Sequence, residues 1–398
     1  MIEAPFFPLI VVGDGDASDP FLGCNRGLIA TGPHDVAFPG FLLAFADEHG
    51  YRPAGIGTAP AGDRSIWFHR AGAGDLGTRA EALARFVAQV CATVCGTDPV
   101  AREAFKVVVL AHGRGILPAR ICAQDTALID KLVLLGADPD ADAADTARRA
   151  LGLAEDQDPA LLYDRFDPSR VLCLTPAATP RPAVRDAATA PVPTGEDGLT
   201  RSAAAYRCCE RFLFGDVRVD LRLFIDHCDP PKGDDRITTS FAIDHALSLR
   251  GTRAPLQASN HAAGGGCCAS LAELAAGLSL GTVVLSTAGR VQRRRQGLGF
   301  GLDLRLFPHH HRDGAPWVDD HFPGQATWGD GIQIDVTPDD GSFKVLHRFA
   351  TGSGRRACPV EVDAIAGCSR ATIAFERKAA PKCTGRIQLM LQHWNNPE

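Results

Sequence analysis

Residues Lys106 to Gly115, KVVVLAHGRG, decide the fold class of this chain. Phe105 to Leu110 is a β-branched, largely apolar run of strand length, which predicts a buried strand. A short turn rich in small residues, Ala111 to Gly115, follows at once, and Ile116 to Ala127 then has a helical pattern. A buried strand that turns so tightly into a helix indicates an α/β domain.

Similar apolar runs lie on both sides of this segment and alternate with predicted helices. They predict strands at Pro8–Val12, Ser65–His69, Lys131–Gly136 and Arg170–Thr175. The clearest helix is Thr78–Cys95, with Thr78 and Glu81 as a predicted capping box. Strands that are apolar on both faces and separated by helices predict a doubly wound, mostly parallel sheet. We assign this α/β domain to residues 1–215, with residues 176–200, rich in Pro, Ala and Thr, as a linker or surface loop.

From Val217 onward, polar and apolar residues alternate with a period of two, which predicts half-buried antiparallel strands. The alternating segments are Val217–Ile225, Gly299–Phe307, Gly331–Thr337, Ser342–Phe349, Pro359–Asp363, Ala371–Phe375 and Arg386–Leu391. The exception is Ala262–Leu280, which is predicted as a Gly/Ala-rich loop leading into a short helix. Residues 216–398 are therefore predicted to form a smaller, antiparallel β-sandwich-like domain.

Charge and composition restrict the class of partner and the cellular location. The 398 residues have a formal net charge of -6 at pH 7, so we expect no general attraction to nucleic acid. No stretch approaches the roughly 18 apolar residues of a membrane-spanning helix, and the first residues lack the pattern of a signal peptide. The 13 cysteines are scattered and form no CxxC motif, which favours reduced thiols in a cytoplasmic protein.

Four stretches together resemble a family of bacterial α/β-hydrolases of lipase or esterase type that carry a β-rich C-terminal half. The stretches are DPFLGCNRG at Asp19–Gly27, RSIW at Arg64–Trp67, LAHGRGI at Leu110–Ile116 and RFLFGD at Arg211–Asp216. The resemblance covers nearly the whole chain. It implies an α/β-hydrolase fold with a nucleophile on a G-x-S-x-G turn, which lifts a serine hydroxyl above the sheet.

The nucleophile and the oxyanion loop that the resemblance implies are degenerate in this chain. In the turn His112-Gly113-Arg114-Gly115, Gly113 stands where the family has its serine. His112 is expected to serve packing, and Arg114 to lie on the surface. The loop after the first strand, Gly13-Asp14-Gly15-Asp16, places carboxylates where a developing oxyanion would need N–H donors.

The implied catalytic base is also missing. In this family the histidine follows the serine and the acid along the chain, yet no histidine occurs between His112 and His227. Asp197 is either a remnant of the triad acid or an ordinary loop residue. Because nucleophile, base and oxyanion donors act as a unit, their joint loss predicts lapsed catalysis.

Other clusters of reactive side chains have simpler interpretations. His309-His310-His311 and the acidic and histidine residues up to His321 offer metal ligands, but their spacing matches no known site and 309–321 is predicted as a loop. Asp226-His227-Cys228-Asp229 places a thiol beside an imidazole, but adjacent residues rarely face each other, so a strand end is expected. Gly264–Gly266 precedes no P-loop lysine. The sequence therefore predicts neither a metal nor a cofactor.

Three hypotheses about function stay open. The first is a non-catalytic hydrolase homologue that binds a hydrophobic or acyl-type small molecule or acts as a scaffold for a protein partner of unknown identity. The second is an active ester or lipid hydrolase with an unconventional nucleophile, such as a cysteine. The third is an interaction protein that acts through its β-domain.

Overall fold

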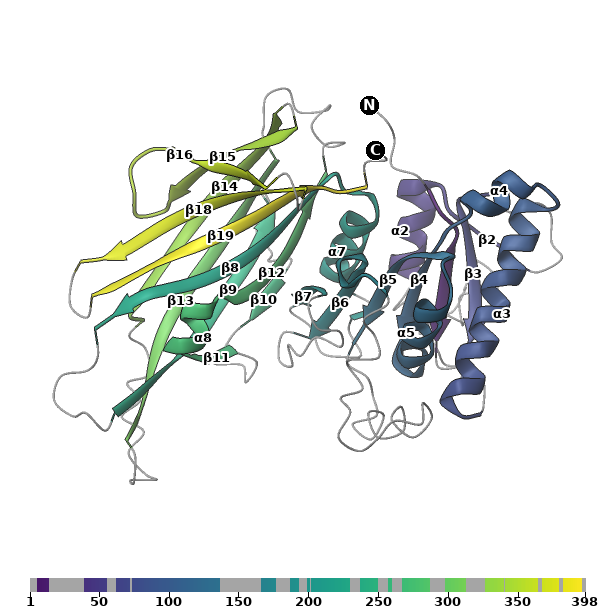
Figure 1. Cartoon of the computed structure of the whole chain (residues 1–398), viewed down its shortest axis with the longest axis horizontal. Helices are drawn as coiled ribbons and strands as arrows, with labels where there is room; N and C mark the ends of the chain where they lie inside the picture. The colour runs from purple at the N-terminus through teal and green to yellow at the C-terminus, as the bar shows by residue number, and fades with distance from the viewer. Residues whose placement is uncertain are drawn as a thin grey trace.

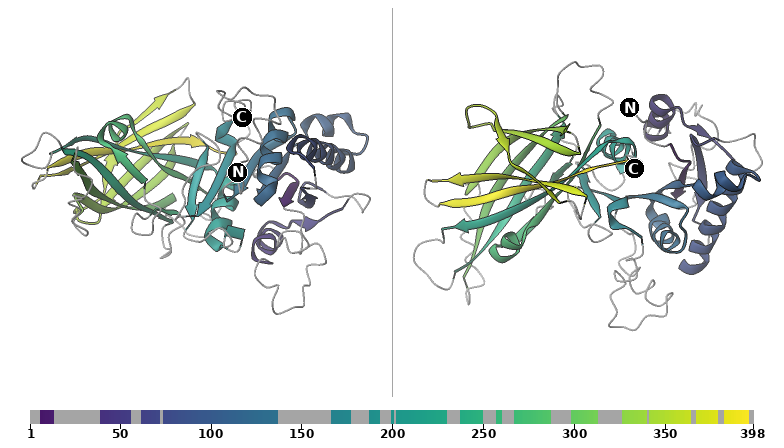
Figure 2. Two further views of the ribbon diagram at one scale, coloured as in Figure 1. Left: turned by 90° about the horizontal axis from the view of Figure 1, so that it is seen from below. Right: turned by 45° about the horizontal axis from the view of Figure 1, so that its top comes forward.

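The computed structural model describes residues 6–13, 39–55, 62–71, 74–136, 166–176, 187–192, 199–200, 202–229, 237–249, 257–259, 267–286, 298–312, 326–339, 341–363, 367–378 and 382–395. These residues form an α/β half and a β-sandwich half that lie end to end (Figures 1 and 2). Among the described helices, none is both long and apolar enough to cross a membrane.

The α/β half is built on one sheet of seven strands. The strands are β1 Leu9–Gly13, β2 Arg52–Pro53, β3 Ser65–Arg70, β4 Val107–His112, β5 Ile129–Leu135, β6 Val171–Pro176 and β7 Ala188–Val192. In space they follow the order β2-β3-β1-β4-β5-β6-β7, and every neighbouring pair is parallel. The predicted parallel sheet is confirmed.

Helices cover both faces of this sheet (Figure 1). They are α2 Pro39–His49, α3 Leu76–Cys95, α4 Pro99–Ala104, α5 Ile116–Asp125 and α7 Ala203–Phe214. Side chains of α3 and α5 pack against one set of strand residues, including Val109 and Ala111, whereas α2 and α7 pack against the alternate set, including Val108 and Leu110. Successive strand residues point to opposite faces, so the strands are apolar on both sides because both sides are covered.

Two local predictions in this half are wrong. Helix α3 begins at Leu76 rather than at Thr78, because the Asp75 carboxylate accepts the Thr78 N–H at 2.8 Å and so caps the helix. Within the linker predicted at 176–200, Ala188–Val192 form the mostly buried strand β7. Pro191 is tolerated there because β7 is an edge strand, which needs only one set of ladder hydrogen bonds.

The second half contains two antiparallel sheets, as predicted. The larger follows the order β10-β9-β13-β14-β15-β16 with β11 also paired to β9, and the smaller follows β12-β8-β19-β18-β17. The elements are β8 Val217–Cys228, β9 Ile237–Leu249, β10 Gln257–Ser259, β11 Cys267–Ser270, α8 Leu271–Ala276, β12 Leu278–Leu285, β13 Leu298–Arg312, β14 Trp328–Asp339, β15 Ser342–Phe349, β16 Arg356–Cys358, β17 Val360–Asp363, β18 Cys368–Arg377 and β19 Cys383–His393. Inward-facing residues of both sheets form one apolar core.

The structure adds features that the sequence pattern did not predict in this half, among them strands β10, β12 and β16. Strand β9 was missed entirely. The stretch predicted as a loop and helix at Ala262–Leu280 contains strand β11 before helix α8. His309–His311, predicted as part of a loop, instead continue β13 and pair with Ser240, Thr239 and Thr238 of β9.

The two halves share part of one apolar core. Strand β7 lies beside β10 and β12. Val284 of β12 is buried in the cluster formed by α2, α7 and the parallel sheet. Gly281 comes so close to β7 that an added Cβ would lie 3.3 Å from the Thr189 carbonyl oxygen. The boundary between residues 215 and 216 remains a prediction.

Candidate functional site

The turn after β4 is the candidate site, and it forms where the sequence predicts it. Strand β4 ends at His112, residues Gly113–Gly115 make one short 3-10 turn, and α5 begins at Ile116. In the sheet, β1 lies between β3 and β4. The chain therefore adds β3 on one side of β1 and β4 on the other, so the strand order reverses at β1. Ligands of such α/β sheets bind at the carboxyl ends of strands beside this reversal of order.

Two glycines give the turn its shape. Gly113 has a φ of 55°, in the left-handed region that favours glycine. Gly115 lies against β1, and an added Cβ would stand 2.7 Å from the Val12 carbonyl oxygen. The turn therefore has the close approach and the unusual backbone that a nucleophile-bearing turn requires.

Among the described residues, the thiols of the elements beside this turn are not activated nucleophiles. Cys122 of α5 is buried, and burial raises the pKa of its thiol to about 12. Cys173 of β6 is fully buried as well. A thiol that stays protonated and shielded from solvent is a poor nucleophile. Gly113 itself contributes only backbone.

An imidazole that the sequence analysis missed lies near this edge. In the parallel ladder, His69 of β3 pairs with Val12 of β1. Val12 in turn pairs with Ala111 of β4. Two strand spacings separate β3 from β4, roughly 10 Å, so His69 cannot hydrogen-bond directly to a group at Gly113. Burial lowers the pKa of His69 to about 4, and its ring packs on Phe86 of α3 with centroids 5.0 Å apart. The sequence signal for it was a histidine at the carboxyl end of a buried strand.

The remaining predicted site residues lie apart or outside the described residues. His112 is half-buried at the end of β4, and Arg114 is exposed on the turn. The Gly13 carbonyl accepts a hydrogen bond from the Ala71 N–H at 3.0 Å. Asp14 and Asp197 lie outside the described residues, as do residues 313–321 of the histidine-rich segment.

One cluster of metal-ligand type is present among the described residues. The ligand atoms of Glu48, His49 and Glu210, where α2 meets α7, lie within 4.8 Å of one another. The Arg207 guanidinium already binds this cluster, 2.6 and 2.9 Å from the two Glu48 carboxylate oxygens and 3.1 Å from Glu210. Because the Arg207 guanidinium binds both carboxylates, the cluster is explained as an ion-pair network that ties α2 to α7.

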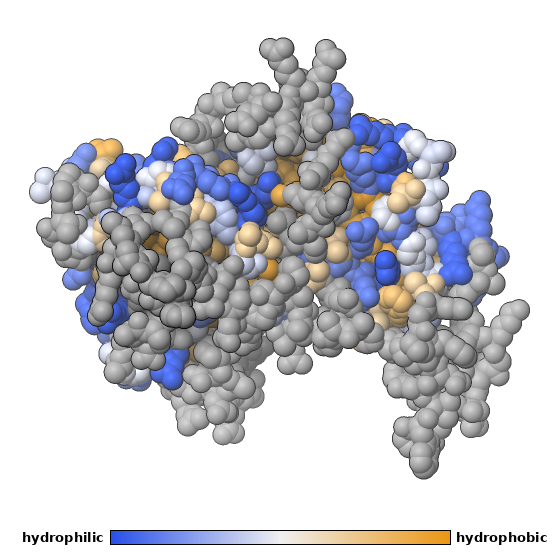
Figure 3. Space-filling model, turned by 180° about the vertical axis from the view of Figure 1, so that it is seen from behind, coloured by the Kyte–Doolittle hydropathy of each residue, from blue (hydrophilic) through white to orange (hydrophobic). Residues whose placement is uncertain are grey.

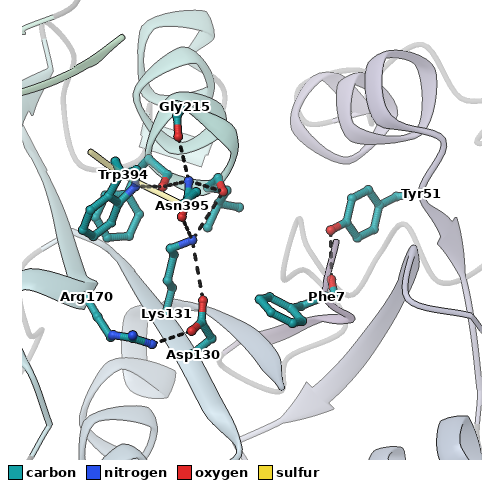
Figure 4. Close-up of polar contacts among 10 residues, drawn as sticks. Phe7, Tyr51, Asp130, Lys131, Arg170, Gly215, Trp394 and Asn395 are labelled. Carbon is teal, nitrogen blue, oxygen red and sulfur yellow. Dashed lines mark hydrogen bonds and ion pairs between the residues drawn. The ribbon is translucent and has the colours of Figure 1, made fainter. Parts of the chain in front are cut away.

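A second polar network lies at the amino ends of the strands (Figure 4). Lys131 of β5 is buried, and its ammonium group contacts Asn395, the Leu213 carbonyl oxygen at 3.4 Å and the Asp130 carboxylate at 3.5 Å. Burial lowers the pKa of Lys131 to about 8, against the opposing effect of Asp130. Asp130 is also paired with Arg170.

The chain that follows β19 supplies the other side of this network. Trp394 donates its indole N–H to the Phe212 carbonyl oxygen at 2.6 Å, and Asn395 donates to Leu213 at 2.8 Å and to Gly215 at 2.9 Å. These carbonyls belong to the last turn of α7 and the residue after it, where a helix leaves acceptors unpaired. The network is therefore a joint that fixes the end of the β half onto the α/β half.

A hollow of about 1060 Å³ lies between strands of the two sandwich sheets. Trp328 and Phe375, which line it, stack with ring centroids 4.2 Å apart. Exposed cations, Arg305, Arg356 and Lys378, reach it from three different segments. It is also lined by the carboxylates of Asp303, Asp330 and Glu376. The hollow therefore has mixed charge and suits a small polar ligand with an anionic group that reaches the cations.

Comparison with known proteins does not identify the family of this chain. No protein family matches it, and no curated protein does. Among solved structures, a phospholipase PlaB from Legionella pneumophila in complex with thio-NAD is similar at 10% identity with a TM-score of 0.28, over 78% of this chain and 90% of that chain. A likeness at this level carries no weight for fold or function, so the family resemblance inferred from the sequence stays a hypothesis.

Proposed function

We propose that this chain is a catalytically lapsed relative of the α/β-hydrolases of lipase or esterase type. It keeps the hydrolase architecture for binding or scaffolding, and a hydrophobic or acyl-type molecule is its predicted small-molecule ligand. The observation that carries the proposal is Gly113. At the sharp bend after β4 a nucleophile would need an oxygen or a sulfur, and this residue has no side chain.

The surroundings of Gly113 support the same conclusion. The thiols of the neighbouring elements are buried, and His69 is two strands away, neutral and packed on an aromatic ring. Each missing function normally contributes orders of magnitude to the rate, and the functions act together. A cytoplasmic location remains part of the proposal.

The test is a fluorophosphonate probe combined with a p-nitrophenyl ester assay on the unmodified protein and on Gly113→Ser. We expect neither labelling nor turnover in either protein, because a serine without a base stays unreactive. Gly136→Ser is a matched control, since Gly136 follows the next strand and also has a positive φ, 99°. Thermal denaturation would confirm that both variants fold.

Two outcomes would contradict the proposal in different ways. Ester turnover by the unmodified protein would show that an unconventional nucleophile is at work, and labelled peptides would locate it. Labelling of Gly113→Ser but not of Gly136→Ser would show that a competent base still serves the turn.

A second candidate function is ligand binding by the β half. The hollow lined by Trp328 and Arg305 favours it, whereas exposed apolar surface does not. The large hydrophobic residues exposed on the described strands of this half, Leu346 and Val362, lie on separate strands, and on the face in Figure 3 hydrophilic residues cover most of the sandwich that is coloured. A thermal-shift screen of small phosphates and carboxylates should find a compound whose effect is lost in Arg305→Ala. A compound that acts equally on both proteins would argue against this site.

A further inference from the structure

We infer that a peroxide oxidises Cys228 and Cys383 to a disulfide. This bond would link β8 to β19 covalently in the smaller sandwich sheet. The two cysteines lie near opposite ends of the β half in sequence. They are nevertheless direct partners in the antiparallel ladder. In the structure both are free thiols, so it represents the reduced form.

The ladder places the two residues at a separation that suits a disulfide. In the next pair along, the Asp229 N–H donates to the Lys382 carbonyl oxygen at 2.9 Å, and the Asp229 carboxylate accepts the Lys382 N–H at 2.8 Å. That pair occupies a hydrogen-bonded position, so Cys228 and Cys383 occupy a non-hydrogen-bonded one. Partners in such a pair have Cα atoms about 4.5 Å apart, within the range of about 4.4–6.8 Å found for disulfides.

The two thiols already touch, and they differ in access. A hydrogen bond joins them, which lowers the pKa of the Cys228 thiol and raises that of the Cys383 thiol. Cys228 is half-buried, whereas Cys383 is fully buried. Cys228 is therefore the thiol that an oxidant reaches, and Cys383 is the one that resolves the product.

The chemistry balances with a peroxide as the oxidant. The Cys228 thiolate attacks one peroxide oxygen, the O–O bond breaks, and a sulfenic acid and one water leave this step. The Cys383 sulfur then attacks the sulfenic sulfur, the S–O bond breaks, and hydroxide departs with the Cys383 proton as a second water. The two thiols lose two electrons, and the peroxide gains them.

Another pair of touching thiols in the same chain gives an internal control. Cys91 and Cys95 lie one turn apart on α3, and a hydrogen bond joins their thiols. Residues four apart on a helix have Cβ atoms about 5–6 Å apart, whereas a disulfide needs about 3.5–4.5 Å. Contact alone therefore does not suffice, and only the cross-strand pair has the geometry to close.

The experiment exposes the reduced protein to hydrogen peroxide, blocks the remaining thiols with an alkylating agent and digests without reductant. Mass spectrometry should find a peptide pair linked through Cys228 and Cys383, reversed by dithiothreitol, and no link between Cys91 and Cys95. Because the bond closes a long loop, the oxidised protein should also melt at a higher temperature than the reduced protein.

Variants make the test specific. Cys228→Ser and Cys383→Ala should each lose the linked peptide and the melting shift, whereas Cys268→Ser, which removes an exposed thiol of the same half, should keep both. Oxidation of Cys268 shows that peroxide reached the protein. If Cys268 is oxidised while Cys228 and Cys383 stay separately alkylated, the inference is wrong, even if one variant fails to fold.

Discussion

The two edges of the parallel sheet differ sharply in chemistry. At the carboxyl edge, where α/β proteins place their reactive groups, Gly113 is bare backbone and the thiols of neighbouring elements are buried. At the amino edge, which usually serves only stability, Lys131, Asp130 and Asn395 form a dense polar network. Among the described residues of the two edges, the denser polar network therefore lies at the joint between the halves.

The two edges also differ in what holds them in place. Burial of an ammonium group is unfavourable unless partners surround it, and Lys131 has such partners in Asp130, Asn395 and the Leu213 carbonyl oxygen. The turn after β4 keeps its shape, through Gly113 and Gly115, without the atoms that would react.

The largest effect is expected at the amino edge, for Trp394→Ala. This change removes the hydrogen bond to Phe212 and the ring packing on Phe212 and Arg218. Because Trp394 is half-buried, its loss should lower the free energy of unfolding by about 3 kcal/mol, the lower end of the range for aromatic side chains in a core. Chemical denaturation measures it. Trp394→Phe keeps most of the ring and should lose clearly less. Equal losses in the two variants would show that packing does not hold the joint.

A smaller effect depends on pH and isolates Lys131. Burial lowers its pKa in the folded protein to about 8, below its ordinary value of about 10.4. Between these values the unfolded chain binds a proton at Lys131 that the folded protein has released, so the contribution of Lys131 to stability rises with pH from about 8 to about 10. The rise is at most roughly 3 kcal/mol.

The matched variants for this prediction are Lys131→Met and Lys378→Met. Measured by denaturation between pH 7.5 and pH 10, the free energy of unfolding should change more favourably in the unmodified protein and in Lys378→Met, whose lysine is exposed, than in Lys131→Met. Buried thiols such as Cys122, whose pKa is raised to about 12, lower stability over this range in all three proteins, so the difference between the proteins is the quantity to measure. An unchanged pH dependence in Lys131→Met would mean that the lysine is solvated and that the joint is looser than the structure has it.

The sequence predicted those elements in which apolar residues recur at a regular spacing. In Val107–Leu110 every position is apolar because both faces of that strand are covered. In β8, β14 and β19 every second position is apolar because only one face is buried. Strand β9, ITTSFAIDHALSL, was missed because Ala, Ser and His occupy positions along it and obscure the alternation. Strand β7 is buried mainly through small residues, so ATAPV resembled a loop.

The candidate site was predictable only in part, for a different reason. The turn at Gly113 is local in sequence, and its strand, bend and helix could be predicted from adjacent residues. The joint is not local: Lys131 and Asn395 meet across 264 positions, and nothing in either neighbourhood indicates the other. The same holds for Cys228 and Cys383, which only the ladder register brings together.

The smallest effect tests whether the carboxyl edge is held as tightly as the joint. Gly115→Ala would place a methyl group 2.7 Å from the Val12 carbonyl oxygen, so β1 or α5 must shift. Overpacking of this kind should cost about 2 kcal/mol. Gly62→Ala is the control, because no atom lies within 4 Å of its added Cβ, and it should be close to neutral. If Gly115→Ala is equally neutral, the turn is free to move. Only the joint between the halves would then be held rigidly, and the turn after β4 would differ from it in rigidity as well as in its polar groups.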